Sequence, residues 1–199
     1  YKIVRMSAPV FSPSEAELSA FAAEGLPVTV VDEEEPDELI PLVADADIVA
    51  LIGARLPAPV VESLSQCRAI ARMGTGTDKI DVSRATELGI VVANTPSFCV
   101  EEQADHAMAM VLSLARKLTA SQNAMAQGEI LRARDASVTN QRVSTTTLGL
   151  VGFGRSAVHV ARRARGFGMR VLATRKNKNA PSDDADALGV TMTDLDEIL

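Results

Sequence analysis

Two kinds of segment alternate along this chain, and they differ in the spacing of their hydrophobic positions. Short apolar runs rich in β-branched residues predict strands, and the stretches between them, which mix helix formers with polar residues, predict helices. The predicted strands are residues 2–6, 27–31, 47–53, 67–73, 90–96, 148–151, 170–174 and 189–192. Because strands and helices take turns, the pattern predicts an α/β fold with parallel sheets wrapped by helices.

The strongest helical periodicity covers residues 97–118. Ser97 is a good N-cap, and two glutamates follow near the positive end of the helix dipole. A second helical stretch is predicted to about residue 128, and the polar segment 134–146 is predicted to be a loop. Within the long helix, one apolar stripe recurs at steps of three and four residues, at Val100, Ala104, Ala107, Val111, Leu114 and Leu118.

The same helix separates two groups of predicted strands. The tripeptide at 94–96 is the favoured boundary, which gives a first lobe at residues 1–97 and a second lobe at residues 98–199. The second lobe has only three predicted strands, whereas a full dinucleotide-binding lobe has about six. We therefore expect the second lobe to be incomplete at its C-terminus and to leave one sheet edge bare.

Composition narrows the classes of function. The 199 residues carry a formal net charge of -6 and only 3% aromatic side chains, which disfavours nucleic acid as a partner. The longest apolar runs are strand-sized, so no membrane span is expected, and no signal peptide precedes the first strand. Cys67 and Cys99 lie far apart, so we expect reduced thiols in a cytoplasmic protein without a metal site.

A glycine turn at residues 152–157, "GFGRSA", follows a predicted strand and opens a predicted helix. Gly152 suits the tight turn, Gly154 lets the backbone approach a pyrophosphate, and Ala157 lets the helix pack closely on the strand. Amide groups at the helix start would then face the phosphates of a dinucleotide. The alternative is a tight strand-to-helix turn that binds no ligand.

The end of the next strand bears on which nicotinamide cofactor is used. An acidic residue at this place, about 20 residues after the glycines, accepts hydrogen bonds from the ribose of NAD. Here Arg175 and Lys176 stand there, followed by Lys178. Because a guanidinium can grip a 2′-phosphate, the sequence favours NADP over NAD. The alternative is a solvated basic loop on a protein that uses NAD.

Two long motifs, at residues 71–118 and 147–173, resemble the D-isomer-specific 2-hydroxyacid dehydrogenases. This family includes phosphoglycerate dehydrogenase, glyoxylate/hydroxypyruvate reductase and the C-terminal binding protein corepressors, and "SFCVEEQADHA" is most similar to the corepressor-containing branch. The resemblance implies a flavodoxin-like substrate lobe followed by a Rossmann dinucleotide-binding lobe. It also implies that the substrate is a small 2-keto or D-2-hydroxy acid.

The resemblance assigns roles to residues in both lobes. Gly74, Thr75 and Gly76 match the loop whose amides face the substrate carboxylate, and glycines at a strand end can expose such amides, although an ordinary turn is the alternative. Residues 51–53 match the substrate wall.

The remaining matches concern the cofactor. Val100 matches a position near the nicotinamide and equally fits the core stripe. Arg155 and Ser156 match residues over the pyrophosphate, where the family usually has isoleucine in place of Ser156.

The family's catalytic arginine, glutamate and histidine have no match, and we expect them beyond Leu199. His106 and His159 do not occupy the catalytic place. The favoured function is an oxidoreductase that interconverts a small 2-keto acid and a D-2-hydroxy acid with NAD(P), inactive as this chain alone. The alternatives are a corepressor-like nucleotide-sensing interaction protein and an inactive truncated product. By analogy with the family, a homodimer would form through helices around residues 98–128.

Overall fold

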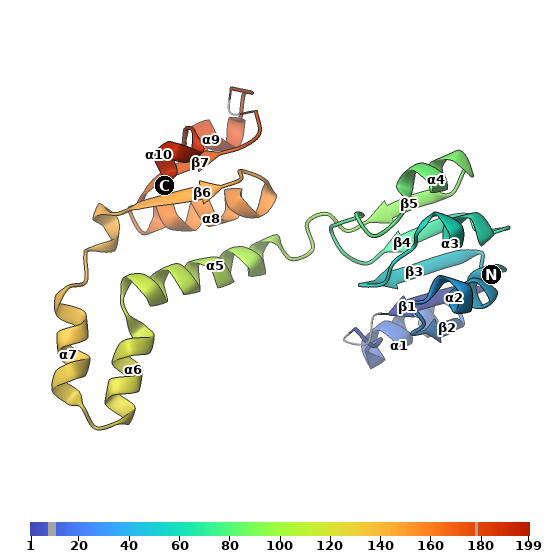
Figure 1. The fold of residues 1–199 in the computed structure, drawn as a ribbon, viewed down its shortest axis with the longest axis horizontal. Coiled ribbons are helices and arrows are strands. Elements are labelled where there is room, and N and C mark those ends of the chain that lie inside the picture. Colours follow the sequence, from blue (N-terminus) through green and yellow to red (C-terminus); the bar gives the residue numbers. More distant parts are fainter. Residues whose placement is uncertain (8–10, 178) are drawn as a thin grey trace. The chain divides into compact units, whose positions relative to one another are not determined.

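The chain forms two compact units, Tyr1–Phe98 and Cys99–Leu199. The computed structural model describes residues 1–7, 11–177 and 179–199 (Figure 1). Both units are built on parallel sheets, as the alternation of strands and helices predicted. The division falls beside the expected boundary, while the substrate and nucleotide roles assigned to the two halves remain predictions.

The first unit contains a five-stranded parallel sheet in the order β2-β1-β3-β4-β5. This is the expected flavodoxin-like order, which reverses between β1 and β3, and such sheets bind ligands beyond the carboxyl ends of strands near the reversal. The elements are β1 (Ile3–Ser7), α1 (Glu15–Ala23), β2 (Val28–Val31), α2 (Pro36–Val43), β3 (Ile48–Ile52), α3 (Ala58–Ser63), β4 (Ala69–Arg72), α4 (Val82–Glu87) and β5 (Val91–Asn94).

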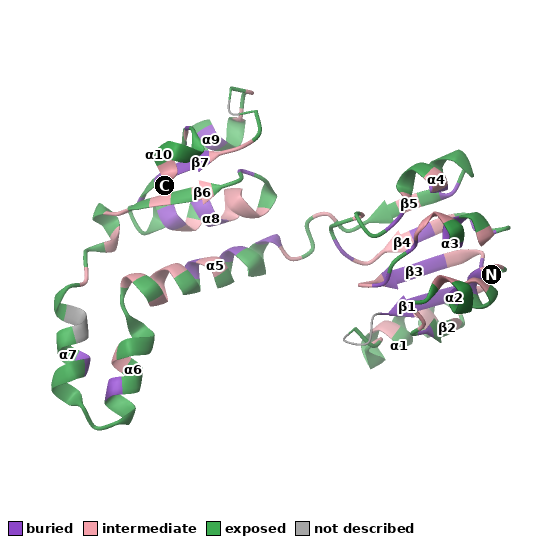
Figure 2. Cartoon of the chain, viewed as in Figure 1, coloured by how far each residue is buried: buried purple, intermediate pink, exposed green. Residues whose placement is uncertain are grey.

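The two central strands, β1 and β3, carry the buried core of this unit (Figure 2). One buried side chain is charged: Arg5 is 2% exposed, and its Nε lies 2.6 Å from Oε1 of Glu17 in α1. Its Nη1 also donates to the carbonyl of Met6 at 2.8 Å. Because α1 has no buried residue of its own, this ion pair attaches the helix to the sheet.

The second unit begins with three helices and ends with a three-stranded parallel sheet in the order β6-β7-β8. Among the described residues, β6 pairs only with β7, and Val151 at its end is 71% exposed. That the lobe is incomplete remains a prediction. The elements are α5 (Val100–Ala115), α6 (Leu118–Ala126), α7 (Ile130–Val138), the 3-10 turn η1 (Val143–Thr145), β6 (Thr147–Val151), α8 (Arg155–Gly166), β7 (Arg170–Thr174), α9 (Asp183–Leu188), β8 (Thr191–Met192) and α10 (Leu195–Ile198).

The core of the second unit lies where α5 packs against α8. Ala104 and Met108 of α5 share one apolar cluster with Val160, Ala161 and Ala164 of α8. The small alanines allow the two helices to approach closely. No helix in the described part of the chain has the length and apolar character needed to cross a membrane.

The predicted helix at 97–118 is divided in the structure. Lys117 has φ 52, a left-handed conformation that ends α5 and starts α6. The predicted apolar stripe is buried only in its first half, since Leu114 is 80% exposed and Leu118 is 53% exposed. The predicted loop at 134–146 was also wrong at its start, because α7 continues through Val138. Helix α7 packs along α6, a contact that local polarity did not reveal.

A group of charged and polar side chains also joins α5 to α8. Oε1 of Glu101 lies 2.7 Å from Nδ1 of His159, and Oε2 lies 2.5 Å from Nη2 of Arg163. Nε of Arg163 reaches Oδ1 of Asp105 at 2.6 Å. The hydrogen bond from Arg163 lowers the pKa of Glu101 below its ordinary value of 4.5. Folding therefore favours the ionised form of Glu101.

This contact predicts a pH-dependent contribution to stability. A carboxyl group with a lowered folded pKa stabilises the fold above its unfolded pKa, and this contribution disappears as the pH falls through the folded value. We expect Glu101→Gln to lower the free energy of unfolding at pH 7 and to lose this effect as the pH falls far enough to protonate Glu101 in the folded protein. Urea unfolding across this pH range measures the difference.

Glu102→Gln is the matched control, because the neighbouring Glu102 is also exposed and loses the same charge. It should change stability little at any pH. Equal effects of the two substitutions at pH 7 would show that the contact with Arg163 contributes nothing.

Candidate functional site

The loop that follows β4 contains the first predicted site, residues 74–76. Four successive carbonyl oxygens of this loop accept hydrogen bonds, so its acceptors are occupied. Two donors come from the last residue of β4, and the other two come from the end of β5 and the residue after it. The bonds are Arg72 Nη1 to Met73 O (2.9 Å), Thr95 N to Gly74 O (3.1 Å), Asn94 Nδ2 to Thr75 O (2.7 Å) and Arg72 Nε to Gly76 O (2.9 Å).

The amide groups of the same loop, unlike its carbonyls, include two that are not hydrogen-bonded. Within the described ranges, the amides of Thr75 and Gly76 have no hydrogen-bond partner, and both residues are exposed. Successive unpaired amides beside hydrogen-bonded carbonyls present two adjacent donors, which suits an anion such as a carboxylate. The sequence predicted these residues, but Arg72 and Asn94 were missed because their role depends on the fold of the loop.

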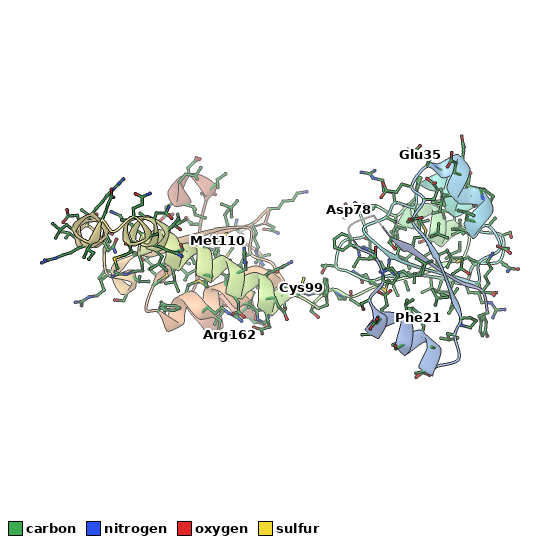
Figure 3. The ribbon with its side chains drawn as sticks, turned by 90° about the horizontal axis from the view of Figure 1, so that it is seen from below. Phe21, Glu35, Asp78, Cys99, Met110 and Arg162 are labelled. Carbon is green, nitrogen blue, oxygen red and sulfur yellow. The ribbon has the colours of Figure 1, made fainter. Side chains whose placement is uncertain are left out.

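Two charged residues lie on the same segment. Nζ of Lys79 donates to the carbonyl of Gly53 at 2.7 Å, which ties this segment to the loop after β3. Asp78 lies on the loop itself (Figure 3), and its Oδ1 is 2.7 Å from where a Cβ on Gly76 would stand. Asp78 thus opposes an anion at Gly76, and the positive charges of Arg72 and Lys79 offset it.

The glycine turn lies between β6 and α8. Gly152 has φ 102, a conformation that favours glycine, and its amide donates to the Thr174 carbonyl at 2.9 Å. Gly154 has an extended backbone and is the N-cap of α8. A Cβ on either glycine would meet nothing within 4 Å, so the space above the turn is open. These residues therefore fit a dinucleotide pyrophosphate at the first amides of a 12-residue helix.

The residues after the turn have distinct surroundings. Ala157 packs on the core of the unit, as its small size suggested, and Arg155 is exposed. The hydroxyl of Ser156 donates to Oε1 of Gln103 on α5. Nε2 of Gln103 in turn lies 3.3 Å from Sγ of Cys99, the residue before α5 (Figure 3). No sequence signal identified Gln103, because the contact joins residues 53 positions apart.

Val100 begins α5 and is 9% exposed. Its burial agrees with the core role that the stripe predicted, and a position near a nicotinamide remains a prediction.

Arg175 follows β7, at the place that was predicted to select the cofactor. Its guanidinium donates to three carbonyls of the next loop: Asn177 at 3.0 Å, Pro181 at 3.2 Å, and Ala180. Nη1 of Arg175 has no partner among the residues that the structure describes. The adjacent Lys176 is exposed, and Lys178 lies outside the described residues. Arg175 therefore holds the carbonyls of its own loop, and a role in selecting the cofactor remains a prediction.

Among the described residues, the other reactive side chains do not gather into a further site. His106 is exposed on α5, and His159 contacts Glu101. Both cysteines are free thiols, and burial raises the pKa of Cys67, which keeps this thiol protonated. In the described part of the chain, no group of three or more histidine, cysteine, aspartate or glutamate residues could hold a metal ion.

Comparison with known proteins identifies relatives that match most of this chain. The family described as "D-isomer specific 2-hydroxyacid dehydrogenase, catalytic domain" matches residues 8–196. Glyoxylate reductase of Pyrococcus furiosus is 33% identical over 184 residues, which cover 88% of this chain and 54% of that protein. The chain thus spans about half the length of such curated relatives.

Solved structures share the fold. D-lactate dehydrogenase of Aquifex aeolicus, in a complex with NAD and lactic acid, has a TM-score of 0.80 at 22% identity, covering 100% of this chain and 57% of that one. An acyclic imino acid reductase in complex with NADPH and D-Arg has a TM-score of 0.76 at 20% identity, covering 100% and 62%. The matching family, the relatives and the two parallel sheets agree with the resemblance found in the sequence. This chain belongs to the D-isomer-specific 2-hydroxyacid dehydrogenase family.

Proposed function

We propose that this chain supplies the substrate-carboxylate loop and the dinucleotide turn of an NADP-dependent reductase of a small 2-keto acid. The observation that carries the proposal is the donor surface at Thr75 and Gly76, whose amides have no partner in the described ranges while the neighbouring carbonyls are occupied. A carboxylate is the group common to all 2-keto and 2-hydroxy acids. The relatives named glyoxylate reductase support a small substrate.

The glycine turn has a complementary task. A bound nicotinamide cofactor supplies the hydride that converts a keto acid into a hydroxy acid. The amides that follow Gly154 bind and orient the pyrophosphate at the positive end of α8, and the positive φ of Gly152 fixes the direction of the turn. The Ser156–Gln103 contact holds the first turn of α8 against α5.

The preference for NADP rests on Arg175 and Lys176. No acidic side chain occupies the ribose position, and Nη1 of Arg175 has no protein partner in the described residues. A 2′-phosphate would accept a hydrogen bond from this nitrogen and would be attracted by the positive charge of Lys176. NAD remains the second choice, because the other nitrogens of Arg175 already bind the loop carbonyls.

The proton donor is not assigned within these residues. His159 contacts Glu101 in α5, and His106 is exposed on α5. We place the family's arginine, glutamate and histidine beyond Leu199, so the complete reaction is proposed only for a protein that contains them. Because no donor is assigned here, a nucleotide-sensing interaction protein is the second candidate, and an inactive truncated product is the third.

We propose that the working protein is a homodimer and lies in the cytoplasm. Both cysteines are free thiols, which suits a reducing compartment. Large apolar side chains are exposed along α5 to α7, including Met110 at 52% (Figure 3), Leu114 at 80% and Leu131 at 74%. Such a group of exposed apolar residues is typical of a protein interface, and a second copy of this chain is the partner that we favour.

The function is tested by a panel of 2-keto acids with NADPH, using the protein expressed from its whole gene. Turnover supports the reductase, tight NADPH binding without turnover supports the nucleotide sensor, and absence of both overturns the proposal. Gly152→Ala should weaken NADPH binding by about tenfold, because it strains the turn. Gly128→Ala is the matched control, since Gly128 has a similar left-handed φ of 74 and equally open space.

Cofactor choice is tested by Arg175→Asp. We expect the ratio of NADPH to NADH affinity to fall by about tenfold or more, because a carboxylate repels the 2′-phosphate and accepts from a ribose hydroxyl. Titration calorimetry with both cofactors gives this ratio. Arg170→Gln, at the opposite end of β7, controls for the loss of a positive charge. If Arg175 serves only the loop, both affinities fall together and the ratio does not change.

Self-association is tested by Leu114→Glu and Leu131→Glu. Each substitution places a charge in the proposed interface and should convert the dimer to a monomer in sedimentation experiments. Leu88 lies between α4 and β5 of the first unit and is 44% exposed. Leu88→Glu should therefore leave the dimer intact. A monomeric parent protein contradicts the proposal directly.

A further inference from the structure

Arg72 has an unusual position for a positively charged residue beside a proposed anion site. It is the last residue of β4, and its side chain turns along the loop that follows. Nη1 donates to Met73 O at 2.9 Å, and Nε donates to Gly76 O at 2.9 Å. One planar guanidinium therefore connects two carbonyls that are three residues apart. This fixes the path of the main chain between them.

We propose that Arg72 is a positioning residue: it holds loop 73–77 so that the amides of Thr75 and Gly76 are presented to a substrate carboxylate, and it does not bind that carboxylate itself. The inference rests on the proposed function, which assigns the carboxylate to this loop. Beyond that function, we infer that the Arg72 side chain keeps the Thr75 and Gly76 amides accessible to the carboxylate.

The glycine at position 74 supports this role. A Cβ on Gly74 would stand 2.3 Å from Nη1 of Arg72 and 2.7 Å from Cζ. Gly74 has no left-handed φ that would demand glycine for its own sake. The residue is small because the guanidinium lies against it. The guanidinium of Arg72 can therefore lie along the loop only because residue 74 has no side chain.

Strand β5 supplies the other half of the support. Nδ2 of Asn94 donates to Thr75 O at 2.7 Å, and the amide of Thr95 donates to Gly74 O at 3.1 Å. Together with Arg72, these donors occupy every carbonyl from 73 to 76. A carbonyl held on one side turns the following amide to the other side, because the peptide unit is planar. Thr95 and Asn94 thus direct the amides of Thr75 and Gly76, and Arg72 fixes the peptide units on either side of them.

The competing role is direct binding of the carboxylate by Arg72. Nε and one hydrogen of Nη1 already serve main-chain carbonyls, so only Nη2 and the second hydrogen of Nη1 are left for a substrate. A bidentate pair that uses Nε would break the bond to the Gly76 carbonyl and release the loop whose amides are needed at the same time. The charge of Arg72 still contributes, because it offsets Asp78 beside Gly76.

The test is a titration of the isotope-labelled chain with glyoxylate, followed by the chemical shifts of the Thr75 and Gly76 amides. Arg72→Lys keeps the charge but replaces the planar guanidinium with a single ammonium nitrogen, which cannot hold both carbonyls in the same geometry, and Arg72→Gln removes both the charge and the guanidinium. We expect the dissociation constant to rise by about tenfold in both variants. Asn94→Ala should act in the same direction without changing the charge. Arg68→Gln, at the other end of β4, is the control for charge and should bind normally.

The outcomes separate the two levels of the proposal. If Arg72→Lys binds like the parent while Arg72→Gln does not, Arg72 acts by its charge and the positioning role is overturned. Normal glyoxylate binding by both variants overturns it as well. If the parent amides do not respond to glyoxylate, the carboxylate site itself fails, and this inference fails with it. Backbone order parameters without ligand give an independent measure, because residues 74–77 should become more mobile in Arg72→Gln.

Discussion

Main-chain polar groups need partners wherever the chain leaves a parallel strand, and both candidate sites depend on how this need is met. After β4, the carbonyl oxygens receive donors from Arg72, Asn94 and Thr95, which leaves amides available to a ligand. After β6, the left-handed turn at Gly152 leads into α8, whose first amides have no acceptor within the helix. Each site is a set of hydrogen-bond donors at the carboxyl end of a strand.

Arginine has a consistent role in this chain that its charge alone does not suggest. Arg5, Arg72 and Arg175 each donate to main-chain carbonyls, and the five donors of a guanidinium allow one side chain to hold several of them. In the core, Arg5 anchors α1; in the loops, the other two determine the path of the backbone. At Arg175 this structural task coexists with the proposed phosphate contact, because one nitrogen is left over.

Features that depend on residues close together in the sequence were predicted, and features that depend on residues far apart in the sequence were not. The strand at 170–174 and the turn at Gly152 were predicted because β-branched runs and glycine conformations act locally. The exposure of Leu114 and the extension of α7 through Val138 were not predicted. Periodicity shows which residues share a helix face, but only the packing partner decides whether that face is buried.

By itself, the sequence determined the α/β class, the two lobes, the glycine turn and the family, because these depend on local spacing and on long contiguous motifs. Only the tertiary structure decided that Gln103 meets Ser156, that Arg72 and Asn94 occupy the carbonyls around Thr75, and that Arg175 binds its own loop. These contacts depend on where helices and strands bring side chains in space. A hydrogen bond between residues 19 or 53 positions apart leaves no periodic signal in the chain.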